Sequence, residues 1–186
     1  MTYTMEIAGL KRDLPLCKIN DDLYIAAFIC FGDAELCVAC ARDLLKLVPR
    51  EDYDYILTAE AKSIPLAHEM ARQAGLDKYF IGRKVPKAYM RDPISVTDQS
   101  ITTAGQQRLY LGRDDADLIK GKRILLMDDV ISTGGSLKAM EELTKAAGGI
   151  IRGKIAVLAE GDAAKRPDIK YLGVLPLFNA DGSIKE

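Results

Sequence analysis

The sequence has only one histidine, His68, among its 186 residues, and this scarcity narrows the chemistry open to it. Zinc hydrolases usually take several imidazole ligands, and a Ser-His-Asp triad needs a histidine placed beside its nucleophile. His68 lies within a helical pattern at 66–70, so we expect it to pack against other side chains or to face solvent. Both hydrolase classes are therefore disfavoured.

A surplus of positive charge is also missing. The 26 lysines and arginines are balanced by 27 aspartates and glutamates, which leaves a formal net charge of -1. Proteins that bind nucleic acids usually carry a basic excess. We therefore expect no nucleic-acid partner.

Long hydrophobic runs are absent as well. No stretch reaches the roughly 20 apolar residues that span a bilayer. Residues 1–11 lack the basic, apolar and small-residue regions of a secretory signal. The sequence therefore predicts a cytoplasmic protein without a membrane partner.

Cysteine does not occur after residue 40. A secreted disulfide scaffold would usually spread its cysteines through the chain, so this clustering agrees with a cytoplasmic location. Cys37 and Cys40 form a C-x-x-C pair, but a single pair is a weak zinc signal. Because residues 34–48 have the apolar spacing of a helix, core packing is favoured over a metal or redox site.

The chain alternates short apolar runs with helical patterns, which is typical of an α/β protein. We predict a single domain over 1–186, with a parallel sheet flanked by helices on both faces. Ligands of such sheets bind at the carboxyl ends of the strands. The predicted strands are 55–58, 79–81, 123–128, 155–159 and 171–175, and the predicted helices are 34–48, 64–73 and 136–147.

Two segments depart from this alternation. Residues 1–33 fit no strand–helix unit, and we expect an added strand or a small cap over the site. Residues 84–120 interrupt the pattern. Their middle, 95–105, is rich in Ser, Thr, Gln and Asp and is predicted to be an exposed, mobile excursion. Long excursions in compact domains are often lids or binding loops.

The most informative segment is 125–136, which reads Leu-Leu-Met-Asp-Asp-Val-Ile-Ser-Thr-Gly-Gly-Ser. Its apolar run predicts a buried strand, and Asp128 and Asp129 at the strand end can accept hydrogen bonds from a sugar diol. The glycines of the following turn let the backbone approach a ligand closely, and amides at a helix N-terminus bind anions. A diol acceptor beside a phosphate cradle predicts a ribose 5-phosphate site.

A plain strand–turn–helix junction, capped by Ser132 or Thr133, is the simpler interpretation. It does not explain two adjacent acids followed by a hydroxyl-rich double glycine, because such an acid pair repels itself. Other phosphate motifs are missing. The sequence has no G-x-x-x-x-G-K-[ST] and no G-x-G-x-x-G after the first strand, which disfavours P-loop NTPases and dinucleotide folds.

Residues 125–137 resemble the signature with which type I phosphoribosyltransferases bind phosphoribosyl pyrophosphate (PRPP). Residues 54–178 are similar to the adenine branch of that family and, less closely, to the xanthine branch. The resemblance implies that Asp128 and Asp129 hold the ribose hydroxyls at the catalytic centre. It also implies that the ribose 5-phosphate is bound by Val130, Ile131, Ser132, Thr133, Gly134, Gly135 and Ser136.

The loop after the first predicted strand resembles the family's pyrophosphate loop, which often reads Glu-Ala-Arg-Gly. Here it reads Glu60, Ala61, Lys62 and Ser63. Lys62 supplies a positive charge without the bidentate fork of arginine. The resemblance implies a non-proline cis peptide near Ala61–Lys62. A plain helix start capped by Ser63 is the alternative.

Arg83, Lys84 and Lys87 resemble the family's Arg-Lys-x-x-Lys pattern, whose cations grip PRPP, sometimes across a dimer. A solvated basic loop is the alternative. Residues 92–109 lie where the family has a flexible lid, although 100–103 lack the Ser-Tyr pair and nearby Glu of many adenine enzymes. Glu160 and Asp162 follow another strand and could contact the base or a metal, or act as turn residues.

The resemblance thus implies a homodimeric purine phosphoribosyltransferase of purine salvage. It would use PRPP, a free purine base, with adenine the first choice, and Mg²⁺ carried mainly by PRPP. One alternative is an enzyme acting on xanthine, hypoxanthine or a pyrimidine such as orotate. Another is a non-catalytic, PRPP-sensing regulator on the same fold. The regulator is disfavoured because the first 50 residues show no clear helix-turn-helix and no basic stripe.

Overall fold

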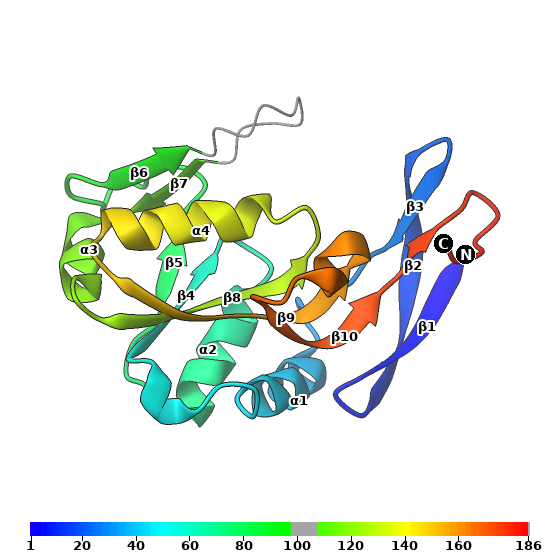
Figure 1. Cartoon of the computed structure of the whole chain (residues 1–186), viewed down its shortest axis with the longest axis horizontal. Coiled ribbons are helices and arrows are strands. Elements are labelled where there is room, and N and C mark those ends of the chain that lie inside the picture. The colour runs from blue at the N-terminus through cyan, green and yellow to red at the C-terminus, as the bar shows by residue number, and fades with distance from the viewer. Residues whose placement is uncertain (98–107, 186) are drawn as a thin grey trace.

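A computed structural model describes residues 1–97 and 108–185 of the chain. Its centre is a five-stranded sheet in the order β10-β9-β8-β4-β5, in which every neighbouring pair is parallel (Figure 1). The predicted α/β architecture with a parallel sheet is confirmed. The strands of this sheet are β4 (Tyr55–Ala59), β5 (Phe80–Gly82), β8 (Arg123–Ile131), β9 (Ile150–Glu160) and β10 (Lys170–Leu175).

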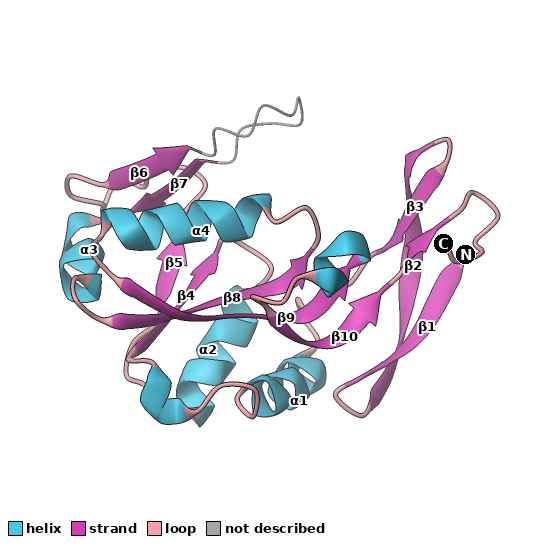
Figure 2. Cartoon of the chain, in the orientation of Figure 1, coloured by secondary structure: helices cyan, strands magenta, loops and turns pink. Residues whose placement is uncertain are grey.

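Helices cover both faces of the parallel sheet (Figure 2). Helices α1 and α2 pack into one buried apolar cluster, and α3 and α4 pack into a second. None of the helices in the described part of the chain has the length and apolar character needed to cross a membrane. The helices are α1 (Ala34–Leu44), α2 (Ile64–Gln73), α3 (Arg113–Ile119) and α4 (Gly135–Ala146), with short 3-10 helices η1 (Arg50–Asp52) and η2 (Gly161–Lys165).

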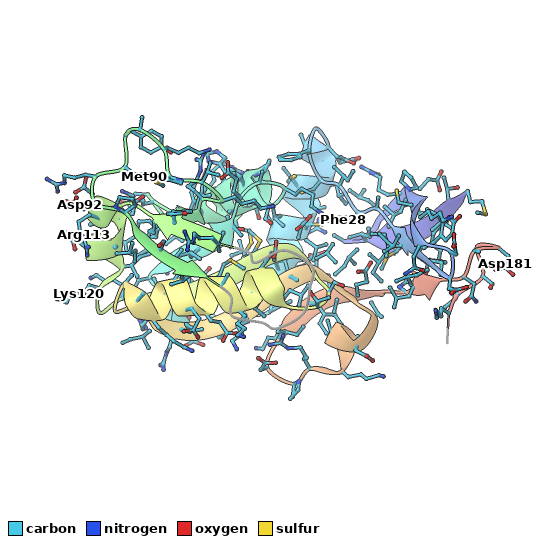
Figure 3. The ribbon with its side chains drawn as sticks, turned by 90° about the horizontal axis from the view of Figure 1, so that it is seen from above. Phe28, Met90, Asp92, Arg113, Lys120 and Asp181 are labelled. Atoms are coloured by element: carbon cyan, nitrogen blue, oxygen red, sulfur yellow. The ribbon has the colours of Figure 1, made fainter. Side chains whose placement is uncertain are left out.

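A second, antiparallel sheet stands at one end of the molecule, where both chain termini also lie (Figure 1). Its order is β1-β2-β3-β11, so the last strand of the chain completes a sheet begun by the first. The buried side chain of Phe28, labelled in Figure 3, joins the apolar cluster shared with α1. These strands are β1 (Thr2–Ile7), β2 (Leu10–Asn20), β3 (Leu23–Ala26) and β11 (Leu177–Phe178).

The prediction of an irregular excursion over 95–105 is wrong for residues 95–97, which belong to a strand. Strand β6 (Ile94–Thr97) pairs antiparallel with β7 (Arg108–Leu111). Leu109 and Leu111 of β7 are buried, so the pair belongs to the core around α4. Residues 98–107, which include 100–103 of the expected lid, lie outside the described residues.

Strand β8 is longer than predicted. It continues through the acids to Ile131, because Val130 and Ile131 pair with Leu158 and Ala159 of β9. Asp128 and Asp129 therefore lie inside a strand rather than at its end. Strand β9 likewise begins at Ile150 instead of 155, and helix α1 ends at Leu44 instead of 48.

Candidate substrate-binding site

Two adjacent carboxylates near the carboxyl end of β8 form the centre of the site. Asp128 is 7% exposed and Asp129 is 4% exposed, which is rare for ionisable side chains. The backbone N–H of Asp129 donates to Asp128 Oδ1 over 2.9 Å. Buried carboxylates persist only when other groups compensate them, so their partners are informative.

Ser63 is the closest of these partners. Its hydroxyl donates to Asp128 Oδ1 over 2.7 Å, and its oxygen accepts the Asp129 backbone N–H over 3.2 Å. Ser63 occupies the N-cap position of α2, yet its side chain makes no capping bond there. The alternative in which Ser63 merely caps a helix is therefore wrong, because its hydroxyl binds the acid pair.

Lys62 supplies the opposite charge. Its Nζ lies 3.0 Å from Asp129 Oδ2, and half of the lysine side chain remains exposed. Asp129 Oδ2 itself is buried and receives no well-aligned hydrogen bond from the described residues. Lys62 and Asp129 thus form an ion pair by distance, and a hydroxyl group could bind Asp129 Oδ2 only where it replaces the ammonium.

Burial, and after it the neighbouring charge of Asp129, together raise the pKa of Asp128 to about 7. The hydrogen bond from Ser63 acts in the opposite direction, because it stabilises the carboxylate. Two carboxylates sharing one site cannot both ionise at low cost. The site therefore favours a ligand that donates hydrogen bonds to both acids.

A hollow of about 200 Å³ lies directly beyond the acid pair, at the turn from β8 into α4. Gly134 is the N-cap residue of α4 and has φ +84, a conformation that glycine adopts without strain. A cap by Ser132 or Thr133 is therefore not present. The backbone amides at the N-terminus of α4, together with the helix dipole, make this hollow attractive to an anion. Its lining residues are Asp128, Val130, Ile131, Ser132, Thr133, Gly134, Gly135, Ser136 and Leu137.

Glu60 joins the loop after β4 to the basic loop after β5. Its carboxylate accepts a hydrogen bond from Arg83 Nε over 3.2 Å and from the Lys84 backbone N–H over 3.0 Å. Lys87 Nζ lies 3.7 Å from Glu60 Oε1. Burial alone would raise the pKa of Glu60, but the Lys84 N–H and the charges of Arg83 and Lys87 outweigh it and lower the pKa.

The expected cis peptide occurs one residue earlier than predicted, between Glu60 and Ala61. The structure thus brings three predicted segments to one edge of the parallel sheet: the loops after β4 and β5, and the turn after β8. The contact between Ser63 and Asp128 had no signal in the sequence, because 65 positions separate the two residues.

The remaining candidates lie elsewhere or serve other contacts. Cys37 and Cys40 are buried, free thiols in the apolar cluster around α1. His68 is exposed on α2 and meets the Tyr79 ring edge to face at 5.9 Å. Asp162 forms an exposed ion pair with Lys165 within η2, as a turn residue would. The described residues hold no group of three or more His, Cys, Asp or Glu side chains placed for a metal.

Comparison with known proteins agrees with this geometry. A family model described as "Phosphoribosyl transferase domain" matches residues 39–181. A hypoxanthine/guanine phosphoribosyltransferase from Methanothrix thermoacetophila is 29% identical over 163 residues, covering 84% of this chain and 82% of its own. One from Methanosarcina barkeri is 31% identical over 144 residues, covering 77% and 70%.

Solved structures show the same fold. An adenine phosphoribosyltransferase from Thermoanaerobacter pseudethanolicus superposes with a TM-score of 0.64 at 22% identity, covering 77% of this chain and 83% of that one. An APRTase from Giardia lamblia, complexed with 9-deazaadenine, superposes with a TM-score of 0.62 at 17% identity, covering 94% and 93%. At this identity the likeness concerns the fold alone.

Proposed function

The chain belongs to the phosphoribosyl transferase family, and on that premise we propose that it transfers the 5-phosphoribosyl group of PRPP to a free purine base and releases pyrophosphate. The observation that carries this proposal is the buried pair Asp128 and Asp129 directly beside the anion-attracting hollow at Gly134. The acid pair suits a sugar diol, and the hollow suits a phosphate. We place the reaction in purine salvage, in the cytoplasm, and we propose a homodimer.

The choice of base separates two groups of relatives. The sequence relatives at 29–31% identity are named for hypoxanthine and guanine. The solved structures at 17–22% identity are named for adenine, which is also the base first expected from the sequence. Because the former share more sequence with this chain, we propose hypoxanthine and guanine as the first bases to test and adenine as the second.

In this proposal the ribose diol donates to the carboxylates of Asp128 and Asp129, and at Asp129 Oδ2 it takes the place of the Lys62 ammonium. The 5-phosphate lies in the hollow, on amides of the Ser132–Ser136 turn. The Lys62 ammonium leaves Asp129 and turns to the diphosphate. The ribose hydroxyls then donate hydrogen bonds to the Asp129 carboxylate in place of the Lys62 ammonium.

The bond between C1 of the ribose and the diphosphate oxygen then breaks, and its electron pair stays on the pyrophosphate. A purine nitrogen attacks C1 from the opposite face, and the N–H proton of the base passes to solvent. Negative charge accumulates on the departing pyrophosphate. Lys62 and the basic loop of Arg83, Lys84 and Lys87 stabilise that charge. Glu60 preorganises the basic loop through its contacts with Arg83, Lys87 and the Lys84 backbone N–H. Holding the base and PRPP in line for the displacement contributes further to the rate enhancement.

Mg²⁺ carried by the diphosphate would neutralise part of its charge and orient it. Asp128 and Asp129 offer hard oxygen ligands of the kind that suits Mg²⁺, but the proposal assigns both carboxylates to the ribose diol, so the diphosphate would hold the ion. Two carboxylates alone make an incomplete cage, which agrees with an ion that arrives with its substrate.

The test is pyrophosphate release from PRPP with hypoxanthine, guanine, adenine, xanthine and orotate in turn. We expect turnover with at least one purine, and its loss by at least 100-fold in the double variant Asp128→Asn/Asp129→Asn. The matched control is Asp114→Asn/Asp115→Asn, an adjacent acid pair on α3, which should keep full activity. Near-normal turnover in the first variant, or no turnover with any purine, would refute the proposal.

A further inference from the structure

The side chain of Ser63 connects the loop after β4 to the acid pair on β8. Ser63 is 1% exposed and stands at the N-terminus of α2, whose Leu66 and Met70 are fully buried in the apolar core. Its hydroxyl makes no bond to the helix that it precedes and reaches Asp128 instead. The family resemblance predicts a diphosphate contact for Ser63, whereas the partners of its hydroxyl lie at the ribose end of the proposed site.

The acid pair uses the only proton of the Ser63 hydroxyl. That proton goes to Asp128 Oδ1, 2.7 Å away, and the hydroxyl oxygen accepts the backbone N–H of Asp129 over 3.2 Å. A diphosphate oxygen needs a donor, and a serine hydroxyl has just one proton to donate. The hydroxyl is therefore suited to holding the acids and not to binding a diphosphate.

Two donors hold one oxygen of the Asp128 carboxylate. The Ser63 hydroxyl and the Asp129 backbone N–H both bind Oδ1, over 2.7 and 2.9 Å. The carboxylate cannot rotate without losing these bonds, and its second oxygen, Oδ2, is left for a ligand. Asp128 also lines the hollow at the turn into α4. A pentose whose phosphate lies in that hollow can therefore present a hydroxyl to an acceptor that is already oriented.

Lys62, the residue before Ser63, holds the other acid in a different manner. Its Nζ lies 3.0 Å from Asp129 Oδ2, but half of the lysine side chain is exposed, so the ammonium can turn to a diphosphate. Ser63 is buried and cannot follow it. Among the described residues, the Ser63 hydroxyl is then the side-chain donor that stays on the acid pair.

We propose that Ser63 is a positioning residue for ribose binding, whose hydroxyl fixes the Asp128 carboxylate in the orientation that accepts a hydroxyl of the pentose. The proposal rests on the proposed function and deepens it, because it divides the loop after β4 between two substrate groups. Lys62 serves the diphosphate, and Ser63 serves the ribose through Asp128. The ligand class is a pentose 5-phosphate with a free diol.

Calorimetric titration of the full chain with ribose 5-phosphate, and separately with pyrophosphate, tests this division. In Ser63→Ala we expect the Kd for ribose 5-phosphate to rise about tenfold, because a charge-assisted hydrogen bond that orients Asp128 is lost. The Kd for pyrophosphate should stay within about twofold, whereas a general defect of the loop would weaken both ligands. The matched control is Ser183→Ala, which removes an exposed hydroxyl that donates to Asp181 Oδ1 over 2.7 Å. It should change neither Kd.

Ser63→Thr and Ser63→Val repeat the comparison if alanine unfolds the chain, as melting curves would show. Both side chains are β-branched, and only threonine keeps the hydroxyl. We expect the threonine variant to bind ribose 5-phosphate at least about threefold more tightly than the valine variant. An equal Kd for ribose 5-phosphate with and without the hydroxyl, or a comparable loss for pyrophosphate, overturns the role of Ser63 alone. If the unaltered protein binds neither PRPP nor ribose 5-phosphate, the proposed function fails, and this assignment fails with it.

Discussion

At the residue scale, the acid pair shows a conflict between stability and binding. Asp128 is buried beside a second acid, and burial favours its protonated form. The hydroxyl of Ser63 and the ammonium of Lys62 compensate the pair only in part. A ligand with two hydroxyl donors completes the compensation. The residues that weaken the free protein are therefore those that the proposed substrate would satisfy.

We predict that Asp128→Asn stabilises the ligand-free protein at high pH. Burial raises the pKa of Asp128 to about 7, against about 4 in an unfolded chain. Between these values the folded state binds more protons, so stability falls as pH rises. Asparagine keeps the acceptor for Ser63 without the charge. These two pKa values set an upper limit of roughly 4 kcal/mol for the gain at pH 8, and we expect no gain at pH 4.

Urea unfolding at pH 4, 6 and 8 would measure this effect, with Asp114→Asn on α3 as the surface control. The control should follow the unaltered protein at all three pH values. Equal stability of Asp128→Asn and the unaltered protein at pH 8 would contradict the account of the buried acid.

At the scale of the element, α1 contains a C-x-x-C motif whose two cysteines pack in the core. Cys37 and Cys40 lie on the buried side of the helix with Leu36, Ala41 and Leu44. Burial is the main cause that raises the pKa of the Cys40 thiol to about 12, and it also raises the pKa of Cys37. A metal ligand or redox cysteine needs the thiolate, which this environment disfavours.

We therefore predict that the native protein presents one reactive thiol. Of the four cysteines, Cys17 is exposed, whereas Cys30, Cys37 and Cys40 are buried. With Ellman's reagent at pH 8 we expect about one equivalent to react quickly in native protein and four in denaturant. Cys17→Ala should remove the fast phase. Rapid reaction of two or more thiols in native Cys17→Ala would show that the α1 pair is accessible.

At the scale of the whole molecule, the two ends of the chain depend on each other. Strand β11 pairs with β3, and the rings of Phe178 and Tyr3 lie 5.0 Å apart. Phe178 is 1% exposed and belongs to the apolar cluster that also contains α1. The antiparallel sheet and the parallel sheet thus share one core, although they come from different parts of the sequence.

We predict that Phe178→Ala lowers the free energy of unfolding by about 3 kcal/mol, because it empties a buried aromatic site. For a chain of this length that corresponds to a melting temperature lower by roughly 6–12 °C. Ile184→Ala, at a side chain that is 54% exposed, is the control and should lower it by less than 2 °C. Similar losses in the two variants would argue against a shared core.

Much of this protein could be predicted from local patterns. Apolar runs and helical spacing located each strand of the parallel sheet and the helices α1, α2 and α4 within a few residues, because burial on one face leaves a periodic trace in the chain. The segment around Asp128 and Gly134 identified the candidate site, since acids, hydroxyls and glycines occur there in one continuous stretch.

Other features depend on residues that meet only after folding. Pairing with β9 extends β8 to Ile131, and pairing with β3 adds β11 to the antiparallel sheet. Glu60 contacts the loop after β5 only because β4 and β5 lie side by side. The contacts of Ser63 with Asp128 and of Lys62 with Asp129 join distant parts of the chain. Local periodicity reports which face of a segment is buried. The pairing of strands decides which side chain it is buried against, so only the tertiary structure could determine these partners.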